Sequence, residues 1–385
     1  MMYSVVENAR YIPVRQRLLN ERNVFIRETT KQQEGCTYSD TLYPHPYLAH
    51  VHHALPPCGL SHVNNVGLFG PDYPYEKDPE HFVVLLTGGS VAAQLATLST
   101  EQRKYLEEFL NRDFVSPNGK PFLILNGGDG AWKYPHQTIL FLLYADVVDA
   151  VITLDGFNEH YLIGTNVRLE YPSSNFLTVN PLVTRSYAEL GRMWLSNKLY
   201  EYALNSWFLS HSNLGYATVR ILRSRLAVDD FKQVEESRRT VFRSQFRLPE
   251  TWSEEKRIEH SLRQYKKYIR IIRSVAEKFD ILSCHFLQPV PALYKSLTDE
   301  EKKVVGDLGY ASKYSRLERE LTTLSEEGIP LFSLLKTFEN VEDTVYQDEI
   351  HYKRTDNGES LGNRLIAEQM ISVLASVWRL KRRSA

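Results

Sequence analysis

The stretch His81-Phe-Val-Val-Leu-Leu-Thr-Gly-Gly-Ser-Val-Ala-Ala93 decides the fold. It begins with a run of apolar and β-branched residues, which is typical of a strand buried on both faces. Gly88 and Gly89 then allow a tight turn, because glycine adopts backbone angles that other residues avoid. Ser90 opens an apolar segment with helical character. The stretch predicts a strand, a turn and a helix, with a serine hydroxyl where unpaired N–H groups favour negative charge.

Two known motifs can be compared with this turn. A phosphate-binding P-loop is excluded because it requires a lysine after a longer glycine loop, and none is present. The nucleophile elbow Gly-x-Ser-x-Gly is matched as far as Val91, but Ala92 takes the place of its last glycine. A plain turn with a capping serine therefore stays open as an alternative at this point.

Apolar segments recur along the chain and alternate with helical pattern. Four further strands are expected, at Pro121–Asn126, Ala150–Leu154, Ile281–Leu287 and Pro330–Leu335. Short apolar strands separated by helices predict an α/β fold with a five-stranded, mainly parallel sheet covered on both faces. In such sheets, binding sites form beyond the carboxyl ends of the strands.

The segments around the sheet complete the expected organisation. Residues 1–80 are predicted to wrap the body as loops and short elements, and 81–385 to form the α/β domain. A long helical insertion is expected at about 167–278. Four histidines (His45, His50, His52 and His53) lie in the wrapping segment. A histidine-rich loop is favoured over a metal site, because no fixed pattern of cysteine or carboxylate ligands accompanies them.

Composition narrows the class of protein. A net charge of −1 over 385 residues argues against a general nucleic-acid-binding surface. Cys36, Cys58 and Cys284 are too few and too widely spaced to predict a disulfide framework or a zinc cluster. No secretory leader is visible and no apolar run is long enough to span a bilayer. We expect a cytoplasmic protein, with a mature form that has lost a leader as the alternative.

Polar groups follow the predicted strands. Gly128 lies in the glycine-rich turn after Asn126, and Asn158 follows the third strand. Their N–H groups suit an oxyanion hole, and a purely structural role in turns is the alternative. Near the C-terminus, Asp348 precedes His351 by three residues. An Asp at this spacing can accept the imidazole N–H while the other ring nitrogen faces a nucleophile.

In chain order, these blocks resemble the SGNH (GDSL-like) hydrolases of bacterial type. The matching blocks are Gly88-Gly-Ser90, Asn126-x-Gly128, Gly156-x-Asn158 and Asp348-x-x-His351. Gly89 stands where many members have Asp, and Asp129 and Asp155 add negative charge beside two blocks. The resemblance implies a three-layer, flavodoxin-like fold. It also implies Ser90 as nucleophile, His351 as base and Asp348 as its orienter, with the Ser90 N–H, the Gly128 N–H and the Asn158 side chain as oxyanion donors.

These residues predict that the protein is a serine esterase. We expect the protein to cleave an O-acyl ester, O-acetyl by preference, through an acyl-enzyme on Ser90. A carbohydrate ester is the substrate suggested by the family's bacterial members, and a small-molecule ester stays open. No metal or organic cofactor is required. The alternatives are an O-acyltransferase with the same three residues and a non-catalytic binding protein that keeps the fold. The oligomeric state is left open.

Overall fold

A computed structural model gives the fold, and the chain divides into two compact units. The sheet unit comprises Tyr43–Phe176 and Phe246–Ala385, and the helical unit comprises Met1–Leu42 and Leu177–Gln245. The structure describes residues 13–15, 18, 41–53, 63–96, 103–173, 175–176, 180, 187–226, 239–355 and 357–383. Cys36 and Cys58 lie outside the described residues.

A five-stranded parallel sheet forms the centre of the sheet unit, as the sequence predicts. Its strand order is β5-β3-β6-β7-β8, which is the 2-1-3-4-5 order of flavodoxin-like folds. The strands are β3 (Phe82–Gly88), β5 (Phe122–Gly128), β6 (Ala150–Asp155), β7 (Leu282–Leu287) and β8 (Leu331–Ser333). The predicted α/β fold class and all five predicted strands are confirmed.

The register of the sheet brings three strand ends together. Gly88, at the end of β3, pairs with Gly128 on β5 and with Leu154 on β6. Every residue of β3 and of β6 is buried, which explains their continuous apolar character. The residues after β3, β5 and β6 therefore share one edge of the sheet.

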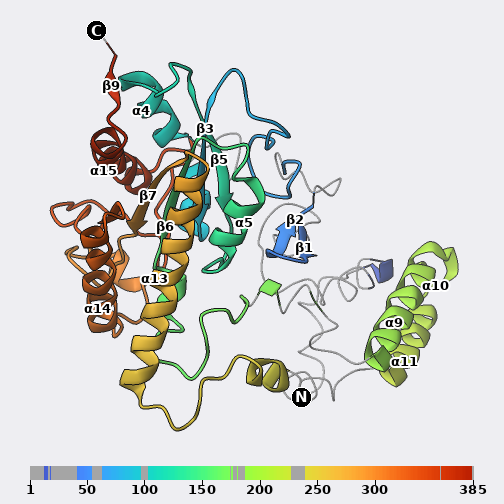
Figure 1. Cartoon of the computed structure of the whole chain (residues 1–385). Helices are drawn as coiled ribbons and strands as arrows, with labels where there is room; N and C mark the ends of the chain where they lie inside the picture. The colour runs from blue at the N-terminus through green and yellow to red at the C-terminus, as the bar shows by residue number, and fades with distance from the viewer. Residues whose placement is uncertain are drawn as a thin grey trace. The chain divides into compact units, whose positions relative to one another are not determined.

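Two groups of helices cover the sheet (Figure 1). One group contains α3 (Ser90–Ala96), α4 (Tyr105–Asp113) and α15 (Leu361–Val377). The other contains α5 (His136–Tyr144), α13 (Glu254–Lys278) and α14 (Ala311–Thr322). Helix α13 lies within the stretch predicted as an insertion, yet it packs on the sheet. Its buried residues recur at helical spacing: Leu262, Tyr265, Ile269 and Ile272.

Smaller elements complete the sheet unit. Two short sheets pair β1 (Leu42–His45) with β2 (Ala49–His52), and β4 (Phe114–Val115) with β9 (Lys381–Arg382). The short helices are α6 (Phe157–His160), η1 (Glu301–Lys303) and η2 (Thr323–Glu327).

The helical unit has a small core of its own. Its described helices include α9 (Tyr187–Asn205), α10 (Trp207–His211) and α11 (Asn213–Leu226). The core residues are Val14, Leu18, Tyr200, Ala203 and Val219. Among the described helices of both units, none combines the length and the apolar character needed to cross a bilayer.

The two chain segments that lead into and out of the helical unit lie side by side within the sheet unit. Val167 forms an antiparallel bridge with Arg247. The Arg168 N–H donates to the Phe246 carbonyl at 2.9 Å, and the Leu248 N–H donates to the Asn166 carbonyl at 2.8 Å. This short bridge, which we call the stem, joins the two segments within the sheet unit.

One buried histidine makes the stability of the sheet unit depend on pH. His285 on β7 is 0% exposed, its Nδ1 lies 3.1 Å from the Thr153 hydroxyl, and burial lowers its pKa to about 3. An unfolded histidine binds a proton below about pH 6.5, whereas folded His285 stays neutral there. The folded state must therefore lose stability as the pH falls from about 6.5 towards 3.

We predict that His285→Gln reduces this acid sensitivity. Between pH 7 and pH 5, the free energy of unfolding of the native protein should fall by about 2 kcal/mol more than that of the variant. Urea unfolding followed by circular dichroism at both pH values measures the difference. An equal fall in the two proteins would contradict the prediction.

Candidate active site

Ser90 is placed by the turn between β3 and α3. A Cβ on Gly88 would lie only 2.0 Å from the Leu154 carbonyl oxygen, so this close backbone approach requires glycine. Ser90 is the first residue of α3, and its N–H therefore has no carbonyl acceptor in a preceding helical turn. The predicted turn brings the hydroxyl and this N–H to the carboxyl edge of the sheet.

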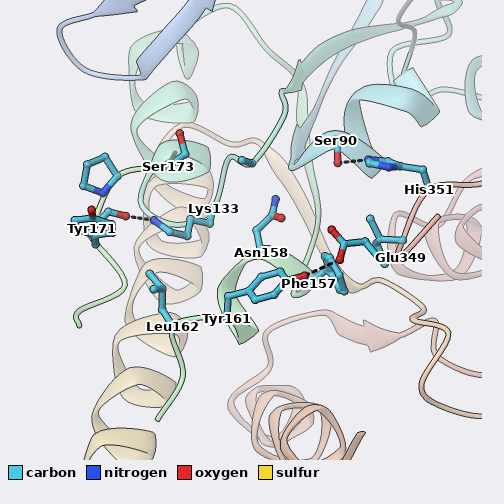
Figure 2. A pocket seen from close by; sticks show the side chains of 13 residues that line it. Ser90, Lys133, Phe157, Asn158, Tyr161, Leu162, Tyr171, Ser173, Glu349 and His351 are labelled. Atoms are coloured by element: carbon cyan, nitrogen blue, oxygen red, sulfur yellow. Dashed lines mark hydrogen bonds between the residues drawn. The ribbon is translucent and has the colours of Figure 1, made fainter. Parts of the chain in front are cut away.

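The structure brings Ser90, His351 and Asp348 into one chain of hydrogen bonds. The Ser90 hydroxyl lies 2.7 Å from His351 Nε2 (Figure 2), and His351 Nδ1 lies 2.8 Å from Asp348 Oδ2. The N–H groups of Ile350 and His351 also donate to Asp348 Oδ1, at 3.0 and 2.7 Å. Partial burial opposes the charge of Asp348, but these hydrogen bonds outweigh it and lower its pKa to about 2. Asp348 is therefore an anion at neutral pH.

Asn158 follows β6 and points towards Ser90 (Figure 2). Its Nδ2 donates to the Trp132 carbonyl at 2.7 Å, which fixes the orientation of the amide, and a primary amide carries a second N–H. A Cβ on Gly89 would lie 2.3 Å from this Nδ2. The glycine at position 89, where the resembled family often has Asp, thus makes room for the Asn158 amide.

The third expected donor is already engaged. The Gly128 N–H donates to Asn126 Oδ1 at 2.9 Å. Asn126 is fully buried, and its backbone carbonyl accepts a hydrogen bond from the Tyr73 hydroxyl at 2.8 Å. The structure therefore places Gly128 beside α3, as expected, with its N–H bound to a side chain.

Asp129 contacts the histidines of β2. Asp129 Oδ1 lies 3.0 Å from His52 Nε2, and Oδ2 lies 3.3 Å from His50 Nε2. Burial opposes the charge of Asp129, but the two imidazoles outweigh burial and hold its pKa well below the ordinary value. Among the described residues, no group of three or more His, Cys, Asp or Glu side chains is arranged to hold a metal ion. Two of the four noted histidines thus bind a carboxylate.

Asp155 and Glu159 are buried carboxyl groups that hold the turn around Asn158. Asp155 accepts a hydrogen bond from the Tyr265 hydroxyl, and Glu159 accepts the N–H groups of Gly156 and Tyr134 at 2.9 and 3.0 Å. Burial and the neighbouring Glu159 raise the pKa of Asp155 well above its usual range, which favours the neutral acid. Asp155 therefore adds little negative charge beside Asn158.

A cavity of about 440 Å³ opens beside these groups. Ser90, Asn158 and His351 line it together with Lys133 and Glu349 (Figure 2). Its remaining walls are largely apolar or aromatic, from Phe157, Tyr161, Leu162, Tyr171, Pro172 and Ile350. At the rim, the Tyr161 hydroxyl donates to Glu349 Oε2 at 3.2 Å.

Sequence reasoning missed three of the polar residues at this cavity. Glu349 directly follows Asp348, and Tyr161 comes three residues after Asn158, so both were close to predicted blocks. Lys133 lies four residues after Asp129, next to the Asn126-x-Gly128 block. A second charged residue so close to a matched block was the signal that could have identified it.

Comparisons with known proteins give weak likenesses only. No protein-family model matches the chain, and no curated protein matches it in sequence. Among solved structures, the acetyl xylan esterase AlAXEase is 13% identical with a TM-score of 0.36, over 76% of this chain and 99% of that one. A putative acylhydrolase from Bacteroides fragilis is 10% identical with a TM-score of 0.35, over 80% and 92%. Axe2, an acetylxylan esterase from Geobacillus stearothermophilus, is 12% identical with a TM-score of 0.35, over 78% and 97%.

We predict that Asp129→Asn destabilises the sheet unit. The variant leaves His50 and His52 without their buried anion, which should lower the free energy of unfolding by about 2 kcal/mol. The exposed Asp146 provides a matched control, because Asp146→Asn changes the same group in solvent. Thermal unfolding of the three proteins measures the effect, and equal melting temperatures would show that the anion does not stabilise the histidines.

Proposed function

We propose that the protein is a serine esterase with Ser90, His351 and Asp348 as its catalytic residues. The observation that carries the proposal is the continuous hydrogen-bond chain from the Ser90 hydroxyl through His351 to Asp348. This is the arrangement that nucleophilic catalysis by serine requires: a nucleophile, a base, and a carboxylate that holds the base in one tautomer. Its position at the mouth of a cavity gives an ester access to the hydroxyl.

The reaction follows from this geometry. The Ser90 oxygen attacks the ester carbonyl carbon while its proton passes to His351 Nε2. The bond to the alcohol breaks, the alcohol takes that proton, and the acyl group remains on Ser90. Water then gives a proton to His351 and attacks the acyl carbon, which releases the acid and restores the serine. Asp348 accepts the Nδ1–H bond throughout and stabilises the imidazolium.

The negative charge that develops on the carbonyl oxygen needs hydrogen-bond donors. The Ser90 N–H at the start of α3 and the second N–H of Asn158 are the donors that the geometry offers. The Gly128 N–H can join them only when its hydrogen bond to Asn126 Oδ1 is broken. We therefore assign the first two as the resting oxyanion donors and Gly128 as a donor that depends on Asn126.

The cavity supports a small polar ester as substrate, an O-acetyl group on a carbohydrate above all. Its volume of about 440 Å³ suits a compact ligand. Tyr161 and Tyr171 offer aromatic surface to a sugar ring, and the Glu349 carboxylate at the rim can accept hydrogen bonds from hydroxyl groups.

We predict that Ser90→Ala abolishes both ester turnover and labelling by a fluorophosphonate probe. The variant removes the only atom that forms the acyl bond. His351→Ala should lose a similar amount of activity, and the double variant little more, because the residues act as a unit. Turnover of p-nitrophenyl acetate and a gel of the labelled proteins measure both effects. Full labelling of Ser90→Ala would overturn the assignment, and a wild-type protein that neither turns over nor labels would favour the binding-protein alternative.

We predict that Asn158→Ala lowers kcat by roughly 10²–10³-fold with a much smaller change in KM, since the bond strengthens as charge develops. Gly89→Ala should act in the same direction, because its Cβ would push the Asn158 amide away. The two losses should not add in the double variant. Steady-state kinetics of the three variants test this. Additive losses would show that Gly89 acts by a route other than Asn158.

A further inference from the structure

Lys133 presents a buried ammonium group at one side of the cavity. The residue is 5% exposed, and its Nζ donates to the Leu169 carbonyl at 2.9 Å and to the Tyr171 carbonyl. Burial lowers the pKa of Lys133 to about 8, against the opposing effects of Glu159 and Glu170. A buried cation is costly unless it is paired, so these two carbonyls are its principal anchors.

One of these carbonyls, that of Tyr171, belongs to a segment that forms one wall of the cavity, and Leu169 lies two residues before it. Tyr171, Pro172 and Ser173, which we call the cavity wall, all line it. In Figure 2, Lys133 and Tyr171 lie on one side of Asn158, and Ser90 and His351 lie on the other. The distance between this wall and Ser90 therefore limits what the cavity accepts.

Other contacts hold the wall near its ends. The Tyr268 hydroxyl donates to Glu170 Oε1 at 2.7 Å, and Asn175 Nδ2 donates to the Gly130 carbonyl at 3.3 Å. Lys133 binds between these points and belongs to the loop whose Trp132 carbonyl orients Asn158. A single loop thus contains Lys133, which binds the cavity wall, and the Trp132 carbonyl, which positions the Asn158 amide.

We propose that Lys133 is a positioning residue that determines substrate size, by holding the cavity wall at a fixed distance from Ser90 through its bonds to the Leu169 and Tyr171 carbonyls. The inference rests on the proposed esterase function. Without the ammonium group, two carbonyls lose their partner, the wall relaxes outward, and the cavity admits larger esters at the expense of small ones.

The test compares Lys133→Met with the native protein. Methionine is close to lysine in length but cannot donate to the carbonyls. The activity, kcat/KM, is measured on p-nitrophenyl acetate, butyrate and octanoate, and on acetate esters of alcohols of increasing size. We expect the ratio of large to small ester to rise by on the order of tenfold in at least one series. Lys133→Arg keeps the charge and the donors and should move this ratio less.

Lys295 supplies a matched control. It is also buried, and its Nζ donates to two backbone carbonyls, those of Val341 and Asp343, at 2.8 and 3.1 Å. It does not line the cavity. Lys295→Met should therefore lower thermal stability without changing the ratio of large to small ester. If the ratio shifts equally in both Met variants, the effect of Lys133→Met is a general loosening of the protein. That result would overturn the proposed role of Lys133.

A second variant tests the wall if Lys133→Met does not fold. Pro172→Gly loosens the wall directly and leaves the lysine in place, so it should shift the ratio in the same direction. Parallel size profiles for the native protein and for every folded variant would overturn the inference. Failure of the esterase proposal is a different result: the native protein would then show no turnover of any ester and no fluorophosphonate label on Ser90.

Discussion

The close approach of three backbones at the carboxyl edge of the sheet is the constraint on which the site depends. Parallel pairing sets Gly88 between Gly128 and Leu154. A Cβ on Gly88 would meet the Leu154 carbonyl at 2.0 Å, and a Cβ on Gly128 would meet the Ala93 nitrogen at 2.7 Å. Only glycine satisfies both contacts, and the start of α3 is therefore held directly against β5 and β6. The same closeness brings Ser90 within reach of groups that follow the other strands.

Three acidic residues near the site each have a partner. Asp129 faces two imidazoles, and burial favours the neutral form of Asp155 beside Tyr265. Asp348 retains its charge and accepts a hydrogen bond from His351. Because an oxyanion is stabilised by donors and destabilised by nearby anions, the neutral form of Asp155 reduces the negative charge beside Asn158, and Glu349 is the carboxylate that lines the cavity itself.

The sequence predicts those parts of the fold and of the candidate site that require a particular local pattern of residues. Strands buried on both faces need continuous apolar runs, which is why β3, β6 and β7 were recognised. Ser90 and Asn158 are predicted as site residues because each follows such a run, and Asp348 and His351 because their spacing allows a hydrogen bond, which the structure contains. The bonds from Lys133 to the Leu169 and Tyr171 carbonyls were not predictable, since backbone acceptors carry no sequence signal. For α13, periodicity indicated the helix but not the surface on which it packs.

The stem has a consequence for how this chain can change over evolutionary time. Because the Val167–Arg247 bridge joins the two segments that flank Leu177–Gln245, the connection from β6 to β7 is closed within the sheet unit. Lengthening a segment whose ends already meet costs little, on the order of 0.6 kcal/mol for each doubling of a flexible loop. Sequence between Leu177 and Gln245 can therefore be gained, lost or exchanged during evolution while the β-sheet and the residues at its edge are inherited unchanged.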